Sequence, residues 1–157
     1  MATAIIPRWR KAKPKDYNLK FEQLYEKMDE VGSGVYGTVY MARRRSDGLM
    51  VALKVTDVDS EGILPTTIKE VTILRNCAGH PHLVNLLDVR LCFLSMKHYM
   101  VMELCETDLE IYARSQALDG GIPPPVVREF IRQILSALQF MHAKDINHRD
   151  LKPSMFL

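Results

Sequence analysis

A glycine-rich turn between two predicted strands is the feature that most limits the folds open to this chain of 157 residues. The turn reads Gly32-x-Gly34-x-x-Gly37, with a predicted strand at Leu24–Val31 before it and another at Thr38–Ala42 after it. A dinucleotide-binding fold needs a helix directly after such glycines, so that the helix N-terminus meets the pyrophosphate. A strand follows here instead, which argues against a dinucleotide-dependent oxidoreductase. The pattern favours a hairpin lid whose backbone N–H groups can approach phosphates, with an ordinary glycine-rich hairpin as the alternative.

The rest of the chain reads as strands with one helix among them, followed by a long helix. Asp47-Gly48 between two strand-like segments is a strong signal for a tight hairpin. The pattern predicts strands at Met50–Val55, Leu83–Val89 and Tyr99–Leu104, and helices at Pro65–Ala78 and 125–143. This order is typical of an α+β fold, with a lobe boundary near residues 104–108.

The long helix carries a continuous apolar stripe. Pro123-Pro124-Pro125 opens it, and proline is favoured in the first turn because its missing N–H is not needed there. The stripe has the spacing of one helix face and is expected to be buried; it consists of Val127, Phe130, Ile131, Ile134, Leu138 and Met141. Left uncovered, such a stripe is an aggregation liability or a face that binds a partner.

Two charged residues are candidates for a phosphate site. Lys54 lies on the strand expected to pair with the glycine lid, where its ammonium group could hold phosphate oxygens. Taken alone, Lys54 could equally be a surface lysine on an edge strand. Glu70 would fix Lys54 in an ion pair if its helix packs against the sheet, although Thr67-x-x-Glu70 also fits a helix capping box.

The most specific string in the chain is His148-Arg149-Asp150-Leu151-Lys152-Pro153, which follows the long helix. A loop at this point could present the Asp150 carboxylate to a substrate hydroxyl and Lys152 to a transferred phosphoryl group. The alternative is a charged, solvated turn. Six specified positions rarely arise by chance, and their position after the lid and Lys54 favours a common function.

Together these motifs resemble the signature set of the eukaryotic Ser/Thr protein kinases. The lid, Val51-Ala52-Leu53-Lys54 and the string at 148–153 stand in the order of that family. The segment Gly62–Glu70 is similar to the cyclin-binding helix of the cyclin-dependent kinases (CMGC group). It departs from that signature at Leu64, Pro65 and Lys69. The resemblance covers residues 22–157.

The resemblance implies a protein-kinase-like fold of the α+β class. Its parts would be a basic disordered arm at 1–20, a complete β-rich N-lobe at 21–104, and the hinge with an incomplete helical C-lobe at 105–157. The implied function is transfer of the γ-phosphate of ATP to protein hydroxyls in the cell cycle, with ATP and Mg²⁺ as cofactors. The implied partners are protein substrates and a cyclin bound through the helix around Leu64–Glu70. Tyr36 is the implied regulatory phosphorylation site, because Val35 beside it has no hydroxyl.

The resemblance also implies a role for individual residues. The implied catalytic residues are Asp150, Lys152, Lys54 and Glu70. The implied ATP-binding residues are Val31, Gly32, Ser33, Gly34, Val35, Tyr36, Gly37, Thr38, Val39, Ala52, Lys54, Glu103, Cys105 and Asp108. Val31, Val39 and Ala52 would enclose the adenine. The backbones of Glu103 and Cys105 would bind its edge behind Met102 as the gatekeeper side chain, and Asp108 would reach the ribose.

The family pattern breaks at Met155. Protein kinases place an asparagine at this position, where it holds a magnesium ion. A thioether is a poor ligand for Mg²⁺, which demands hard oxygen donors, so no residue of the chain is expected to hold the metal. The sequence also ends without an Asp-Phe-Gly string. Two hypotheses follow: the N-terminal fragment of an active kinase, or a truncated, catalytically inactive kinase-like protein that binds nucleotide or cyclin.

Charge and composition bear on the compartment. Residues 1–20 contain six basic residues and one acidic residue, which indicates either a nuclear-import patch at 8–15 or a solvated tail. No apolar run approaches the ~18 residues that cross a bilayer, and the segment before Arg8 is too short for a secretory signal. Three cysteines, Cys77, Cys92 and Cys105, lack metal-ligand spacing. We therefore expect a protein of the nucleus or cytoplasm that binds neither membrane nor nucleic acid.

Overall fold

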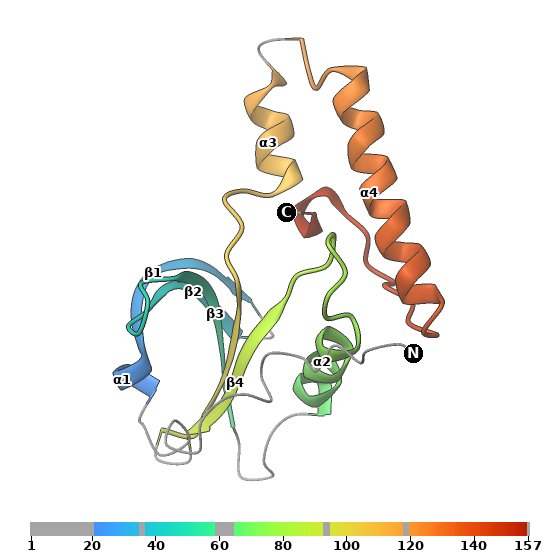
Figure 1. Cartoon of the computed structure of the whole chain (residues 1–157). Helices are drawn as coiled ribbons and strands as arrows, with labels where there is room; N and C mark the ends of the chain where they lie inside the picture. Colours follow the sequence, from blue (N-terminus) through green and yellow to red (C-terminus); the bar gives the residue numbers. More distant parts are fainter. Residues whose placement is uncertain (1–20, 35–36, 59–64, 93–94, 118–119, 157) are drawn as a thin grey trace. The chain divides into compact units, whose positions relative to one another are not determined.

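The structure, a computed structural model, describes residues 21–34, 37–58, 65–92, 95–117 and 120–156 (Figure 1). These residues form two compact units, one made of residues 21–78 and 84–104 and the other of 79–83 and 105–156. Several predicted features lie outside the described residues: the basic arm at 1–20, the tip of the glycine turn at Val35 and Tyr36, and Gly62-Ile63-Leu64 of the cyclin-helix signature.

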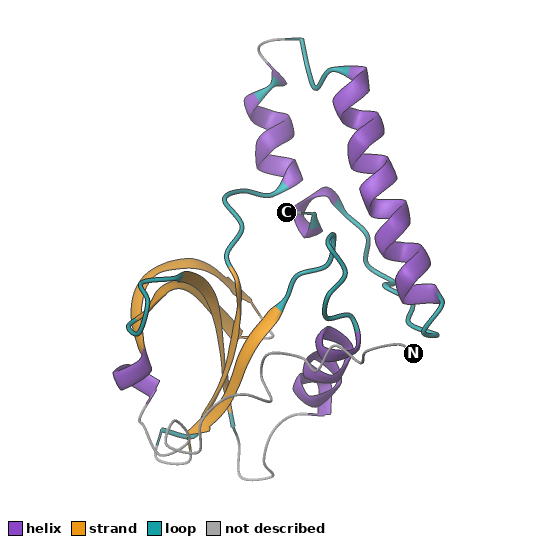
Figure 2. Ribbon diagram, viewed as in Figure 1, coloured by secondary structure: helices purple, strands orange, loops and turns teal. Residues whose placement is uncertain are grey.

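The first unit is a curled, five-stranded antiparallel sheet with two helices (Figure 2). Its elements are α1 (Phe21–Leu24), β1 (Tyr25–Gly34), β2 (Gly37–Arg44), β3 (Met50–Asp57), α2 (Pro65–Asn76), β4 (Leu86–Cys92) and β5 (Lys97–Glu103). The strand order is β1-β2-β3-β5-β4, so β3 is the central strand. With the helices of the second unit, this sheet confirms the predicted α+β class.

The predicted Asp47-Gly48 hairpin joins β2 to β3 and shows why this turn forms. Gly48 has a φ of 74°, in the left-handed region that glycine adopts without a steric penalty. The Asp47 carboxylate accepts a hydrogen bond from the backbone N–H of Leu49 at 3.1 Å and pairs with the Arg44 guanidinium at 2.6 Å. Local side-chain chemistry therefore fixes the register of the two strands that carry the lid and Lys54.

Alternation along β3 sends neighbouring side chains to opposite faces of the sheet. Val51 and Leu53 are fully buried in a core with Val101 and Ala42. Ala52 and Lys54 therefore project from the other face, the face expected to hold a ligand. The core is completed by an aromatic group of Phe21, Tyr25 and Tyr99, in which the rings of Phe21 and Tyr99 stack 4.1 Å apart.

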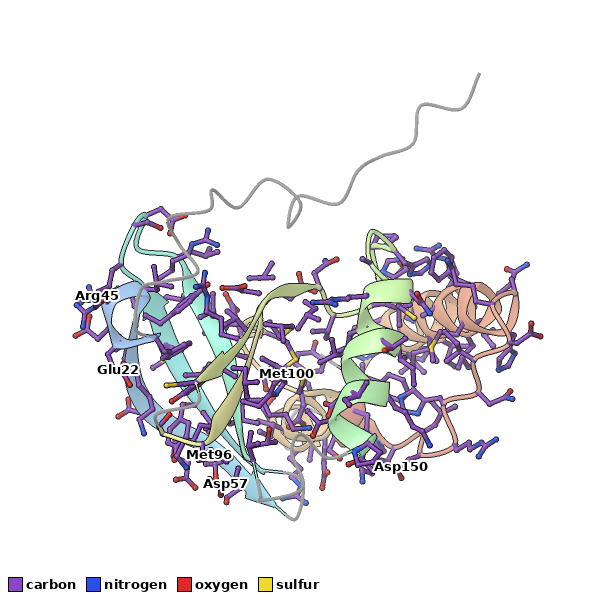
Figure 3. All side chains as sticks on the ribbon, turned by 90° about the horizontal axis from the view of Figure 1, so that it is seen from below. Glu22, Arg45, Asp57, Met96, Met100 and Asp150 are labelled. Atoms are coloured by element: carbon purple, nitrogen blue, oxygen red, sulfur yellow. The ribbon has the colours of Figure 1, made fainter. Side chains whose placement is uncertain are left out.

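The short helix α1 is attached to the sheet by polar contacts as well. Arg45 donates from its backbone N–H to the carbonyl of Leu24 at 2.8 Å. Its guanidinium donates to the carbonyl of Glu22 at 3.0 Å, and Figure 3 shows the two residues side by side. Both contacts satisfy carbonyls of a one-turn helix that has no following turn to bind them. They help to hold Phe21 over the core.

The strands differ from their predicted bounds by one to three residues at most ends, and the shifts in β4 and β1 have a visible cause or consequence. β4 begins at Leu86, three residues later than the apolar run suggested, because the backbone N–H of Asn85 donates to the side chain of Glu103. β1 extends through Ser33 to Gly34, so the first two glycines of the turn belong to the strand. Helix α2 begins at Pro65 as predicted and ends at Asn76, shortly before Gly79 with its φ of 90°.

The second unit consists of α3 (Leu109–Ser115), α4 (Pro124–His142) and a 3₁₀ turn, η4 (Pro153–Met155). Helices α3 and α4 run in opposite directions (Figure 1), and the ring of Tyr112 contacts that of Phe130 edge to face at 5.9 Å. The sequence reading missed α3. The signal was Asp108, which caps the helix by accepting a hydrogen bond from the N–H of Ile111 at 2.8 Å.

The prediction of one buried stripe on α4 is wrong for its outer half. Of its members, Met141 is buried, but Val127 and Ile131 are 37% and 51% exposed. Leu135, outside the predicted stripe, is 59% exposed. Within the described part of the second unit, the helix is covered by α3, which contacts Phe130, and by the loop at residues 79–83, which contacts Ser136 and Phe140. The described part of α4 therefore presents an apolar strip to solvent.

The loop at residues 79–83 falls within the predicted N-lobe but packs with the second unit. The ring of His80 lies 4.8 Å from that of Phe140, and its Nε2 atom is 3.4 Å from the hydroxyl of Ser136. Both partners lie on α4. Contacts far apart in the sequence thus decide where this loop belongs.

Among the described helices, none is both long and apolar enough to span a bilayer.

Candidate nucleotide and catalytic site

Lys54 and Glu70 form the ion pair that the sequence suggested. The Lys54 ammonium lies 2.7 Å from both carboxylate oxygens of Glu70, and its side chain is only 14% exposed. The alternative of a surface lysine on an edge strand is wrong, because β3 is central. The capping-box alternative is also wrong, because Thr67 is buried inside α2 instead of preceding it. A charged group is thus held firmly on the face of the sheet that is expected to hold a ligand.

The glycine lid is a β1–β2 hairpin in which Gly34 pairs with Gly37 and Ser33 with Thr38. Gly37 has a φ of 113°, and a Cβ atom there would lie 2.4 Å from the carbonyl oxygen of Val55. The fold therefore requires glycine at this position. A Cβ at Gly32 or Gly34 would meet no atom within 4 Å. Open space beside these two backbones suits the close approach of a phosphate.

The residues expected around adenine come from neighbouring strands. Val39 pairs with Lys54 and Ala52 pairs with Met102 across the ladders. Val31 lies where the register of β1 shifts, between Glu30 and Gly32, and it is 64% exposed. A strand irregularity of this kind re-aims a side chain. The individual roles of these residues in binding adenine stay predictions.

The expected hinge residues divide between the two units. Glu103 is the last residue of β5 and belongs to the first unit, whereas Cys105 and Asp108 belong to the second. The Glu103 carboxylate is occupied by two hydrogen bonds from Asn85. One carboxylate oxygen of Asp108 is occupied by its role as the N-cap of α3. Sequence reasoning missed Asn85, although a polar residue that interrupts an apolar run is a recognisable signal.

A second residue missed from the sequence is His98, which is 3% exposed on β5. Its Nδ1 atom lies 3.4 Å from the hydroxyl of Thr56. Burial lowers the pKa of His98; the Glu70 carboxylate acts in the opposite direction, and the Lys54 ammonium lowers the pKa further. The sequence offers no motif around His98, so only the structure reveals its place beside the ion pair.

The loop at 148–153 holds its charged residues by contacts within itself. Lys152 lies 3.0 Å from the Asp150 carboxylate, with side chains 52% and 61% exposed. Asp150 is labelled in Figure 3, and its backbone N–H donates to Nδ1 of His148 at 3.4 Å. Arg149 has a φ of 66°, a left-handed conformation that is uncommon outside glycine and is found at functional sites.

The same loop is attached to α3 beyond the charged residues. The carbonyl of Phe156 accepts a hydrogen bond from the N–H of Leu109 at 2.8 Å. Leu109 is the first residue of α3, where backbone N–H groups have no partner within the helix. A backbone hydrogen bond therefore joins the loop end to the start of the helix.

The residues present fit ATP but do not fit Mg²⁺. The held Lys54 and the open glycine backbones suit a polyphosphate. Met155, in the position of the expected asparagine, lies in η4, is 46% exposed and offers only a thioether. Within the described ranges, no cluster of three or more His, Cys, Asp or Glu residues could hold a metal ion. The donor set of the described residues therefore gives no basis for a magnesium site.

A five-stranded sheet with a central lysine paired to a helix glutamate, beside a glycine hairpin, defines the class of protein kinases. A family model described as "Protein kinase domain" matches residues 25–157. The chain therefore belongs to the protein kinase domain family, as the motifs predicted.

Curated relatives narrow the class to the cyclin-dependent type. The chain is 40% identical over 141 residues to cyclin-dependent kinase B2-2 of Arabidopsis thaliana, covering 86% of this chain and 45% of the relative. It is 38% identical over 145 residues to cyclin-dependent kinase B2-1 of Oryza sativa subsp. japonica, covering 88% and 44%. It is 40% identical over 139 residues to cell division control protein 2 homolog D of Antirrhinum majus, covering 85% and 45%. These matches confirm the predicted resemblance to cyclin-dependent Ser/Thr kinases; the chain spans less than half of each relative's length.

Proposed function

We propose that this chain is the nucleotide-binding part of a cyclin-dependent-type Ser/Thr kinase, which transfers the γ-phosphate of ATP to protein hydroxyls. The observation that carries the proposal is the Lys54–Glu70 ion pair, with 2.7 Å to both carboxylate oxygens. The pair fixes a cation on the face of the sheet that also carries Ala52. The family and its named relatives support the same function.

In this proposal the first unit provides most of the residues that bind the nucleotide. The backbone of the lid approaches the phosphates and Lys54 holds their oxygens as a point charge. Val31, Val39 and Ala52 enclose the adenine, and the backbones of Glu103 and Cys105 bind its edge. Asp108 contacts the ribose through the carboxylate oxygen that does not cap α3.

The second unit supplies the groups for transfer in the longer protein. Asp150 accepts the proton of the substrate hydroxyl as that oxygen bonds to the γ-phosphorus and ADP leaves, while Lys152 steadies the transferred group. A cyclin binds through α2, whose exposed Ile68 and Ile73 present apolar surface. We further propose that the kinase acts on protein substrates in the nucleus or cytoplasm. Tyr36 is its proposed regulatory phosphorylation site.

The nucleotide part can be tested by titrating the chain with a fluorescent ATP analogue. We expect Lys54→Met to weaken binding about tenfold or more, because a charged hydrogen-bond partner of the phosphates is lost. Lys97→Met is the matched control, because Lys97 also forms an ion pair, at 2.6 Å with Asp57. Lys97 is the first residue of β5, at the opposite end of the strand from Glu103. Equal affinities for the two variants would contradict the proposed role of Lys54.

A second candidate function rests on Met155: the chain binds nucleotide or cyclin without catalysing transfer. Phosphoryl transfer depends on metal ions that neutralise charge on the phosphates, and Met155 offers no hard oxygen donor. An assay of radiolabelled phosphate transfer by residues 1–157, with Mg²⁺ and a cyclin, separates the two functions. Nucleotide binding without transfer supports the binding protein, whereas transfer that Asp150→Asn abolishes rules it out.

A further inference from the structure

Three hydrogen bonds join one pair of residues in the first unit, Asn85 and Glu103. The backbone N–H of Asn85 donates to Glu103 Oε1 at 3.0 Å, and its side-chain amide donates to Glu103 Oε2 at 3.1 Å. The backbone N–H of Glu103 donates in return to the carbonyl of Asn85 at 3.1 Å. Both residues are partly buried. This pair is the Asn85–Glu103 clasp.

The clasp lies directly before the hinge, so it can fix the direction in which the chain enters the hinge. Asn85 directly precedes β4, and Glu103 is the last residue of β5. On its other side Glu103 pairs with Val51 of β3. Glu103 is thus fixed by two neighbouring segments, and residues 104–105 after it have no regular secondary structure. The clasp therefore sets the point and the orientation from which the hinge leaves the sheet.

The hydrogen bonds of the clasp suit this task. Both oxygens of the Glu103 carboxylate accept from Asn85, so the side chain has one orientation, and bonds to an ionised acceptor are stronger than neutral ones. The asparagine at position 85 suits a carboxylate partner, because its amide donates where an aspartate would repel Glu103. Because Asn85 engages both carboxylate oxygens, we consider the backbone of Glu103, and not its side chain, as the group that contacts a ligand.

We infer that Asn85 is a positioning residue for nucleotide recognition, which acts by holding the backbone of Glu103 against the adenine edge. This inference rests on the proposed nucleotide function. Adenine presents an amine donor where guanine presents a carbonyl acceptor. A backbone carbonyl that is held in place accepts from the amine and repels the carbonyl of guanine. The clasp should therefore control the preference for ATP over GTP as well as affinity.

The test uses a pair of substitutions that break and rebuild the clasp. Asn85→Asp sets two carboxylates against each other and breaks it. Glu103→Gln alone is measured as the second parent of the double variant. The double variant Asn85→Asp/Glu103→Gln restores complementary groups, since the glutamine amide donates to the new carboxylate and its oxygen still accepts the backbone N–H. Asn76→Asp, on the exposed end of α2, controls for an added negative charge.

The readout is the ratio of affinities of the chain for fluorescent ATP and GTP analogues, with the urea midpoint of each variant recorded alongside. We expect Asn85→Asp to lower ATP affinity and the ATP/GTP ratio about tenfold, the size of one lost charged hydrogen bond. The double variant should recover both, and Asn76→Asp should match the unmodified chain. An unchanged ratio in Asn85→Asp, or no recovery in the double variant, overturns the inference while leaving nucleotide binding intact. If the unmodified chain binds neither analogue, the proposed nucleotide function fails, and the positioning role with it.

Discussion

Lys54 in the first unit and Asp150 in the second are held by different kinds of contact. Lys54 is 14% exposed and pairs with Glu70, 16 residues away on another element. Asp150 is 61% exposed and pairs with Lys152 in the same loop. The difference shows that Lys54, the proposed phosphate-binding residue, is held by packing between distant segments. The loop at 148–153 depends on local contacts that solvent can reach, and such contacts are weaker.

The two units also differ in how completely their apolar side chains are buried. In the first unit Leu53, Met100, Val51 and Val101 are fully buried. In the second, Ala137 and Met141 are buried, whereas Ile131 and Leu135 are more than half exposed. Buried apolar area is the main source of stability. We therefore expect substitutions in the sheet to cost more than matched substitutions in α4.

The largest expected effect is that of Leu53→Ala. Removing a fully buried leucine leaves a cavity and should lower the free energy of unfolding by about 3–4 kcal/mol. Ile131→Ala is the matched change in the second unit and should cost less than about 1 kcal/mol, because its side chain is already half exposed. Urea denaturation followed by circular dichroism gives both values. Similar costs for the two substitutions would mean that the second unit is as well packed as the first.

Gly37→Ala should have the next largest effect. A methyl group there meets the Val55 carbonyl at 2.4 Å in a left-handed conformation, and we expect a loss of about 3 kcal/mol. In Gly34→Ala the added methyl group meets no such contact, so the free energy of unfolding should change by less than about 1 kcal/mol. The same variant should weaken binding of the fluorescent ATP analogue. The comparison separates a glycine needed by the fold from one needed by a ligand. A stability loss of equal size at Gly34 would remove that distinction.

Ion pairs test the contrast between distant and local contacts. Glu70→Ala leaves the poorly exposed Lys54 ammonium without its partner and should lower stability by about 1–2 kcal/mol. Arg132→Ala removes a pair with Glu129 at 2.6 Å on the surface of α4, and its thermal midpoint should match that of the unmodified chain. A clear loss of stability in Arg132→Ala together with no loss in Glu70→Ala would contradict this comparison.

The smallest expected effect concerns pH. Burial lowers the pKa of His98 below its ordinary value of 6.5. As pH falls through 6.5 the unfolded chain takes up a proton that folded His98 resists, so stability declines. His98→Asn should flatten this part of the stability curve between pH 7 and 5. Parallel curves for the unmodified chain and His98→Asn would show that His98 does not contribute.

Much of the fold could be read from local patterns. The Asp47-Gly48 turn, the strands on either side of the glycine lid and the start of α2 at Pro65 follow from preferences of neighbouring residues. The apolar stripe correctly predicted the helix α4, but it did not predict which part of the helix is buried. The spacing of apolar residues shows that Val127 and Met141 lie on the same side of the helix. It does not show which positions on that side are covered by other elements.

The sequence by itself determined the family, through motifs in which each residue is specified by its immediate neighbours and by order along the chain. It also indicated Gly37 and Lys54 as parts of one site and Met155 as the break in the pattern. Only the tertiary structure decided that Lys54 lies on the central strand with a side chain only 14% exposed, that Glu70 binds it instead of capping α2, and that Asn85 holds Glu103. The physical reason is that these contacts join residues on separate elements. Their geometry depends on how the sheet and the helices pack together and on which polar groups become buried next to one another.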